Sequence, residues 1–193
     1  MSAARGRRAG RLLTAPLAAL ALAAGACGGG GDPAPAPPAE VAVAGGRTTI
    51  APAPGLREAG IRIAPIPPAG GGGRAVSLPI RGGRLSAGGA TGVIAHRGGL
   101  LAVARRTEVE IVDLRLDAGA GEVSATVAAR RIPLLLLDGR PGPGGLEVDR
   151  TARLTPEAAT LLNDLLGIRT LSSGSPFGLV RVRARAGADG PTP

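Results

Sequence analysis

The chain has 193 residues, a length typical of one domain, and all 23 of its basic residues are arginine. A single cysteine excludes an internal disulfide, and a single aromatic side chain cannot build the stacking platforms that single-stranded nucleic acids need. Four arginines fall in a leader that we expect to be removed, which lowers the formal net charge from +9 to about +5. We therefore expect no nucleic-acid partner.

Residues 1–26 are typical of a secretory signal peptide. Basic residues over 5–11 precede the apolar run Leu12–Ala24, and small residues follow. The run is shorter than the roughly 20 residues of a membrane-spanning helix, and the four leucines at 134–137 are shorter still. Export through the twin-arginine route stays open because of Arg7 and Arg8, although apolar residues do not directly follow that pair.

The residues Ala24-Gly25-Ala26-Cys27 resemble a bacterial lipobox, in which small residues precede a cysteine that becomes acylated and begins the mature chain. One departure is Ala24, which stands where leucine is usual. The resemblance implies a lipid anchor at Cys27 and a location at the cell membrane, on its extracytoplasmic face. Two acyl chains at one site anchor a protein stably where one chain does not. The alternative is an ordinary signal peptide cleaved at the Ala-x-Ala site.

The segment 27–39 reads as a tether between the lipidated cysteine and a folded domain. Its glycine-rich half is flexible, and its Pro/Ala half is stiffer and extended. We expect a β-rich domain over 40–186, followed by a disordered tail over 187–193.

The domain sequence consists of short apolar runs separated by Gly or Pro, a pattern typical of all-β sandwiches and barrels. Alternating apolar residues occur over 41–43, 61–63, 76–80, 109–116, 123–129, 146–154 and 180–184. Pro79 indicates an edge strand or a strand end. The predicted fold is mainly β, an antiparallel β-sandwich or half-barrel with one or two short helices.

Three local features refine this prediction. The tetrapeptide His96-Arg97-Gly98-Gly99 lies between two apolar runs and predicts a hairpin turn. The alternation changes phase near Ile111-Val112, which predicts a β-bulge. The continuous apolar run 132–137 predicts a strand covered on both faces.

One helix is predicted over Pro156–Leu166. Thr155 suits the N-cap, Pro156 the first helical position and Gly167 the end. The apolar stripe of this helix consists of Ala158, Leu161, Leu162, Leu165 and Leu166. A faint echo of the same strand–helix–strand order suggests a second short helix over 54–60.

The strand that ends at His96, followed by His96-x-Gly98-Gly99-Leu100 and two further strands, resembles a group of uncharacterised actinobacterial secreted proteins and lipoproteins. It is also distantly similar, over about residues 84–130, to HtaA-type haem-binding domains. This similarity implies a β-fold and a ligand site near His96. HtaA domains bind haem through an axial tyrosine, and this chain has no tyrosine. The alternative is that the His96 imidazole satisfies backbone groups of a turn, and contact with another ligand or a partner is also open.

Residues suited to catalysis are few. A serine–His96–aspartate triad lacks a nucleophile elbow, because Pro176 stands at the centre of Gly174–Gly178. The carboxylates of Glu108, Glu110, Asp113 and Asp117 are typical of solvated strand faces. We expect no enzymatic activity, no catalytic residue, no cofactor and no metal site.

Arg181, Arg183 and Arg185 alternate with apolar residues and predict one basic side of the last strand. That side either is a soluble outer face that also discourages edge-to-edge pairing, or it faces anionic lipid headgroups. The sequence thus predicts an envelope lipoprotein with a non-enzymatic binding or scaffolding β-domain. Its expected partners are the membrane, through the lipid anchor, and an envelope protein or a hydrophobic ligand. The alternative function is a carrier of haem or a small hydrophobic ligand near His96, which a deep apolar pocket would favour.

Overall fold

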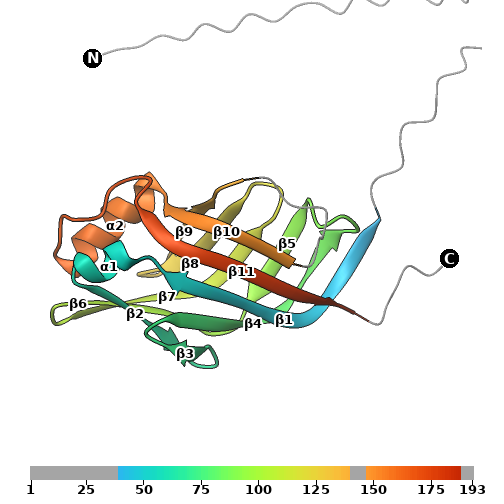
Figure 1. Cartoon of the computed structure of the whole chain (residues 1–193), viewed down its shortest axis with the longest axis horizontal. Helices are drawn as coiled ribbons and strands as arrows, with labels where there is room; N and C mark the ends of the chain where they lie inside the picture. Colours follow the sequence, from blue (N-terminus) through green and yellow to red (C-terminus); the bar gives the residue numbers. More distant parts are fainter. Residues whose placement is uncertain (1–38, 140–146, 188–193) are drawn as a thin grey trace, which may run out of the picture. The chain divides into compact units, whose positions relative to one another are not determined.

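The computed structural model describes residues 39–139 and 147–187 (Figure 1). The predicted signal peptide, Cys27, the tether up to residue 38, Leu146 and the tail after residue 187 lie outside the described residues. In the described part the protein is mainly β with two helices, as the sequence predicts.

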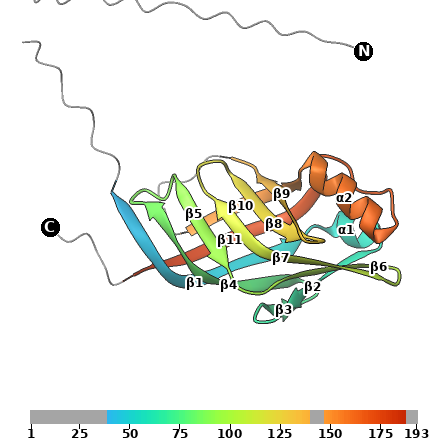
Figure 2. The same cartoon turned by 180° about the vertical axis from the view of Figure 1, so that it is seen from behind.

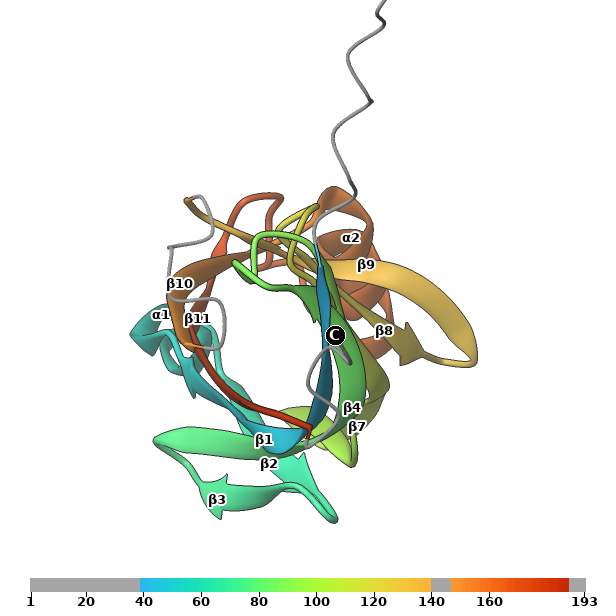
Figure 3. The same ribbon diagram turned by 90° about the vertical axis from the view of Figure 1, so that its right-hand side faces the viewer.

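Eight strands of the described chain close into an antiparallel β-barrel. They are β1 (Glu40–Pro52), β4 (Ala75–Ser86), β5 (Gly92–His96), β7 (Thr107–Asp117), β8 (Glu122–Val127), β9 (Arg130–Leu137), β10 (Glu147–Leu154) and β11 (Pro176–Ala186). Neighbours follow the order β7-β5-β4-β1-β11-β10-β9-β8, and β8 pairs with β7 to complete the ring (Figure 3). The predicted sandwich or half-barrel is therefore replaced by a closed barrel. Strand alternation is the same in open and closed sheets, so the sequence pattern cannot distinguish them.

The remaining strands lie beside the barrel. β6 (Gly99–Ala104) pairs with β7, β2 (Ile61–Ile66) pairs with β6, and β3 (Gly70–Gly72) pairs with β4. The helices α1 (Pro54–Glu58) and α2 (Pro156–Leu166) lie at one end of the barrel (Figures 1 and 2). At the opposite end β1 begins at Glu40 and β11 ends at Ala186, and we call this the entry end.

The barrel interior is filled by aliphatic side chains, and the single aromatic residue, Phe177, is fully buried among them. Inward-facing positions alternate along the strands, as in β8, where Val123, Ala125 and Val127 are buried. Such a core is stabilised by many small dispersion contacts and by the removal of apolar surface from water.

The link between β5 and β6 does not reverse the chain, so the predicted hairpin turn at His96–Gly99 is wrong. β5 and β6 both run antiparallel to β7, and the reversal follows β6 at Arg105-Arg106. Gly98 has a φ of 77°, and a Cβ atom on Gly99 would lie 2.5 Å from a carbonyl oxygen of β7. The two glycines therefore permit an unusual backbone angle and a close approach of strands, both of which exclude larger residues.

The predicted bulge in β7 is present, slightly further along the strand than expected. The register with β8 shifts between Val112 and Arg115, and Asp113 has a φ of 52°. In β9 the register shift opposite β8 turns Leu134 and Leu135 both inward, whereas Leu136 is exposed. The continuous apolar run thus reflects a bulge in β9, and the prediction that both faces are covered is wrong at Leu136.

Pro79 lies in the middle of β4, between β1 and β5, rather than in an edge strand or at a strand end. The Arg97 N–H donates to the Pro79 carbonyl at 2.9 Å, and the nitrogen of a strand residue faces the same side as its carbonyl. On that side β4 changes partner, from β3 up to Ser77 to β5 from Ile80 onward. The sheet therefore needs no backbone N–H from residue 79 on that side, so a proline fits there.

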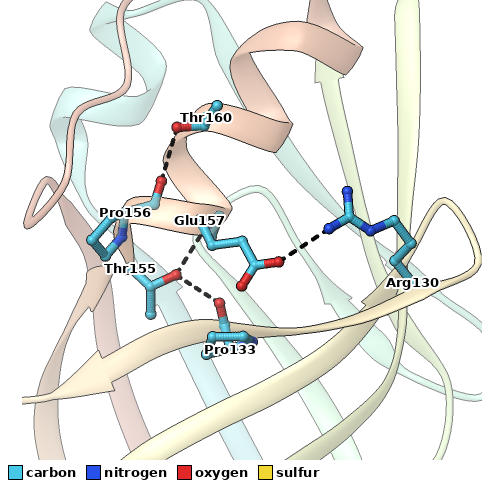
Figure 4. A network of polar contacts seen from close by, with 7 residues as sticks. Arg130, Pro133, Thr155, Pro156, Glu157 and Thr160 are labelled. Carbon is cyan, nitrogen blue, oxygen red and sulfur yellow. Dashed lines mark hydrogen bonds and ion pairs between the residues drawn. The ribbon is translucent and has the colours of Figure 1, made fainter.

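The helix α2 begins and ends where the sequence predicts. The Thr155 hydroxyl accepts the Ala158 N–H at 3.1 Å and donates to the Pro133 carbonyl at 2.6 Å, so the cap also ties the helix to β9 (Figure 4). Gly167 ends the helix with a φ of 65°. The fully buried face consists of Ala158, Ala159, Leu162 and Leu166, with Leu161 and Leu165 partly buried beside it.

Candidate functional site

His96, the only histidine in the chain, lies inside the barrel wall and is 6% exposed. Its Nε2 lies 2.7 Å from Thr48 Oγ1 on β1, and its Nδ1 lies 3.1 Å from the Leu114 carbonyl oxygen in β7. A carbonyl only accepts, so Nδ1 carries a proton and donates to Leu114. In the neutral ring Nε2 then accepts the Thr48 hydroxyl proton. His96 therefore joins three strands from within.

Burial lowers the pKa of His96 from its usual value, and the hydrogen bond to Leu114 opposes this only in part. The ring is consequently neutral at physiological pH. Ligation of a haem iron by Nε2 would require loss of the Thr48 hydrogen bond. His96 satisfies a backbone carbonyl, as the alternative interpretation expects, but from the end of a strand rather than from a turn. The carrier hypothesis at His96 stays a hypothesis that this geometry does not favour.

A groove of 680 Å³ crosses the outer wall of the barrel over β4, β5 and β7, and we call it the arginine groove. It is lined by Glu40, Arg81, Gly82, Gly83, Arg84, Gly92, Val93, Ala95, His96, Asp113, Leu114 and Arg115. Gly83 permits the close approach of β4 and β5 in this wall, because a Cβ atom there would collide with the Val93 carbonyl. The groove is open and partly charged, unlike the deep apolar pocket that would favour a carrier.

Charge in the arginine groove is unevenly compensated. Arg84 Nη1 lies 3.3 Å from Glu40 Oε2, in an exposed ion pair. Among the acids of the described residues, none lies within 4.0 Å of Arg81 or Arg115. Two guanidinium groups of the groove are therefore available to an anion from outside the domain.

The basic side of β11 is present but largely neutralised. Arg181 Nε lies 2.7 Å from Asp149 Oδ1, and Arg183 Nε lies 3.9 Å from Glu147 Oε1, both acids being on β10. The hydrogen bond from Arg181 holds the pKa of Asp149 below its usual value. The three arginines form the expected exposed outer face. β11 lies between β1 and β10, however, so the interpretation that they also discourage edge-to-edge pairing is wrong.

The other side chains that the sequence analysis considered lie in structural settings. The carboxylate of Asp117 accepts the Ala120 N–H at 2.9 Å in the β7–β8 turn. Ser175, beside Pro176, accepts the Ser172 N–H at 3.0 Å within a loop. In the part of the chain that the structure describes, no three His, Cys, Asp or Glu side chains gather closely enough to hold a metal ion. Neither of the helices in that part could cross a membrane.

Sequence reasoning missed Arg150, which lies on β10 and is 6% exposed. The signal was present in the sequence, because Arg150 shares the phase of the apolar residues Ala152 and Leu154. An arginine in the inward phase of a strand predicts a buried charge.

The chain matches no known protein-family model, and no curated protein is significantly similar to it. The similarity to HtaA-type domains and the lipoprotein assignment therefore stay predictions.

Proposed function

We propose that the chain is a lipid-anchored envelope protein whose barrel is a non-enzymatic binding module. The arginine groove is the proposed binding surface, and an acidic segment of another envelope protein is the proposed partner. One observation carries the proposal. The groove holds two guanidinium groups, Arg81 and Arg115, that no described acid neutralises.

The chemistry of the groove suits a peptide that bears carboxylates. The Arg84–Glu40 pair supports this, since a carboxylate already meets an arginine at the edge of the groove. Val93 is 42% exposed and offers an apolar contact between the charged groups. Guanidinium groups stay protonated and only donate hydrogen bonds, which suits anion binding rather than proton transfer.

The position of the groove fits an anchored protein. Glu40 begins β1 and also lines the groove, so the chain enters the barrel at the groove itself. The 13 residues over 27–39 span at most about 45 Å when fully extended. With Cys27 acylated, the groove would stay within that distance of the membrane surface, where other envelope proteins are exposed.

Titration with a synthetic peptide tests the proposal. The probe alternates glutamate with valine, and a second peptide carries glutamine in place of glutamate. We expect the acidic peptide to bind, and Arg81→Gln with Arg115→Gln to weaken its binding by about two- to thirtyfold, since two exposed ion pairs together contribute about 0.4–2 kcal/mol. The matched control is Arg105→Gln with Arg106→Gln, in the turn after β6, which removes the same charge outside the groove. The proposal would be contradicted if both double substitutions weakened binding equally, or if the two peptides bound equally well.

A further inference from the structure

Arg150 is a charged side chain inside an apolar barrel. It shares the inward phase of β10 with Ala152 and Leu154, which are completely buried. Its register partner on β11 is Val180, which is also buried. Among the buried residues that the structure describes, Arg150 is the one that carries a permanent charge, because His96 is neutral.

One polar group of Arg150 has no partner in the described protein. Its Nε is buried without a hydrogen-bond partner. Each ion pair among the described residues uses a different arginine, and none of their carboxylates lies within 4.0 Å of Arg150. Burial lowers the pKa of Arg150 from its usual value, yet a guanidinium stays protonated in proteins. A buried charge without a counter-ion is unfavourable, so an anion that binds beside Arg150 would stabilise the fold.

The head of the side chain lies at the entry end of the barrel. A Cβ atom on Gly121 would lie 3.6 Å from Arg150 Nη1 and 3.5 Å from the Leu137 carbonyl. The Leu137 N–H in turn donates to Gly121 at 2.7 Å. The guanidinium thus lies beside the β7–β8 turn and the end of β9.

The surroundings indicate what kind of anion fits. Nearby inward positions on the neighbouring strands hold the apolar residues Val180, Val182 and Leu137. Asp149, next to Arg150 in sequence, points outward and pairs with Arg181. The described strands therefore place apolar residues beside Arg150, and no carboxylate of the described residues lies within 4.0 Å of it. A guanidinium binds carboxylate and phosphate oxygens through paired hydrogen bonds, and an apolar rim suits an organic acid.

We propose that Arg150 binds the oxyanion of a small organic acid, an aliphatic carboxylate, at the entry end of the barrel. This site is independent of the arginine groove, which lies on the outer wall. Two acidic side chains, Asp32 and Asp189, lie outside the described residues. The alternative is that one of these is the counter-ion of Arg150, and the experiment distinguishes the two.

The test measures thermal unfolding of the full chain carrying Cys27→Ser, with octanoate, acetate or inorganic phosphate added. Octanoate should raise the melting temperature in a saturable way, with an apparent affinity at least tenfold weaker in Arg150→Met. Arg153→Met is the matched control, because Arg153 is an exposed arginine on the same strand, and it should respond as the parent does. A saturable response to all three anions that Arg150→Met abolishes would still assign an oxyanion site, without selection for the aliphatic part.

The stability of each variant without ligand distinguishes an anion site from an internal counter-ion of Arg150. We expect Arg150→Met to be at least as stable as the parent, because it removes an uncompensated buried charge. An internal counter-ion would instead make Arg150→Met less stable, and either Asp32→Asn or Asp189→Asn would lose a similar amount. That result, or an octanoate response that Arg150→Met retains, would overturn the proposal. If Arg150→Met does not fold, the parent protein is titrated with octanoate and the NMR signal of the Arg150 Nε–H is followed. Octanoate must shift that signal if the proposal holds.

Discussion

At the scale of single residues, His96 shows how a residue that suggests ligand binding can instead be a structural link. Both ring nitrogens are engaged within the barrel, one with a backbone carbonyl and one with the Thr48 hydroxyl. A satisfied buried polar group stabilises a unique arrangement of strands, whereas an unsatisfied one is costly. His96 and Thr48 are 48 positions apart in the sequence, so no local pattern could predict their contact.

The neutral state of His96 predicts how stability depends on pH. Its folded pKa lies below the ordinary value of 6.5, so the unfolded chain binds more protons between these two values. The contribution of His96 is therefore complete above pH 6.5 and is lost as the pH falls toward the folded pKa, with a slope of at most about 1.4 kcal/mol per pH unit. Urea unfolding at pH 7.5 and pH 5 measures it. His96→Gln, which cannot titrate, is the control, and a parallel loss of stability in both proteins would show that the ring is not held neutral.

At the scale of elements, the sequence predicts α2 closely, because its signals are local. The cap, the first proline, the apolar stripe and the terminal glycine all lie within a few residues of one another. The bulge in β7 was also visible, as a change of phase in the alternation. The predictions for His96–Gly99 and Pro79 failed, because the role of a glycine or a proline depends on which strand lies beside it.

The buried face of α2 predicts a large effect of truncation. Leu162 is 2% exposed, so Leu162→Ala should lower the free energy of unfolding by about 2–5 kcal/mol, as lost burial and a new cavity both contribute. Leu161→Ala is the matched control, since Leu161 is only partly buried and should lose clearly less. The urea midpoints of the two variants provide the comparison. Equal losses would mean that the helix does not pack through the Leu162 face.

At the scale of the whole molecule, barrel closure decides where the candidate sites lie. The pairing of β8 with β7 completes a ring, so each strand of the ring has an inside and an outside. The groove arginines 81, 84 and 115 come from two strands that are distant in the sequence. The hairpin turn predicted at His96–Gly99 does not pair β5 with β7, so it could not predict that these arginines lie close together. The buried charge of Arg150 was visible in the phase of β10, but its setting depends on the closed barrel.

Photo-cross-linking in the intact envelope can show whether the arginine groove is a binding surface. A photoreactive residue at position 93 should cross-link to a protein segment rich in Asp and Glu, and Arg81→Gln with Arg115→Gln should abolish the product. Leu179 is the matched control position, because it is 40% exposed, close to the 42% of Val93, but lies on β11 outside the groove. We expect a cross-linked product from position 93 and none from position 179. Identical products from both positions, or a cross-linked segment without acidic residues, would contradict it.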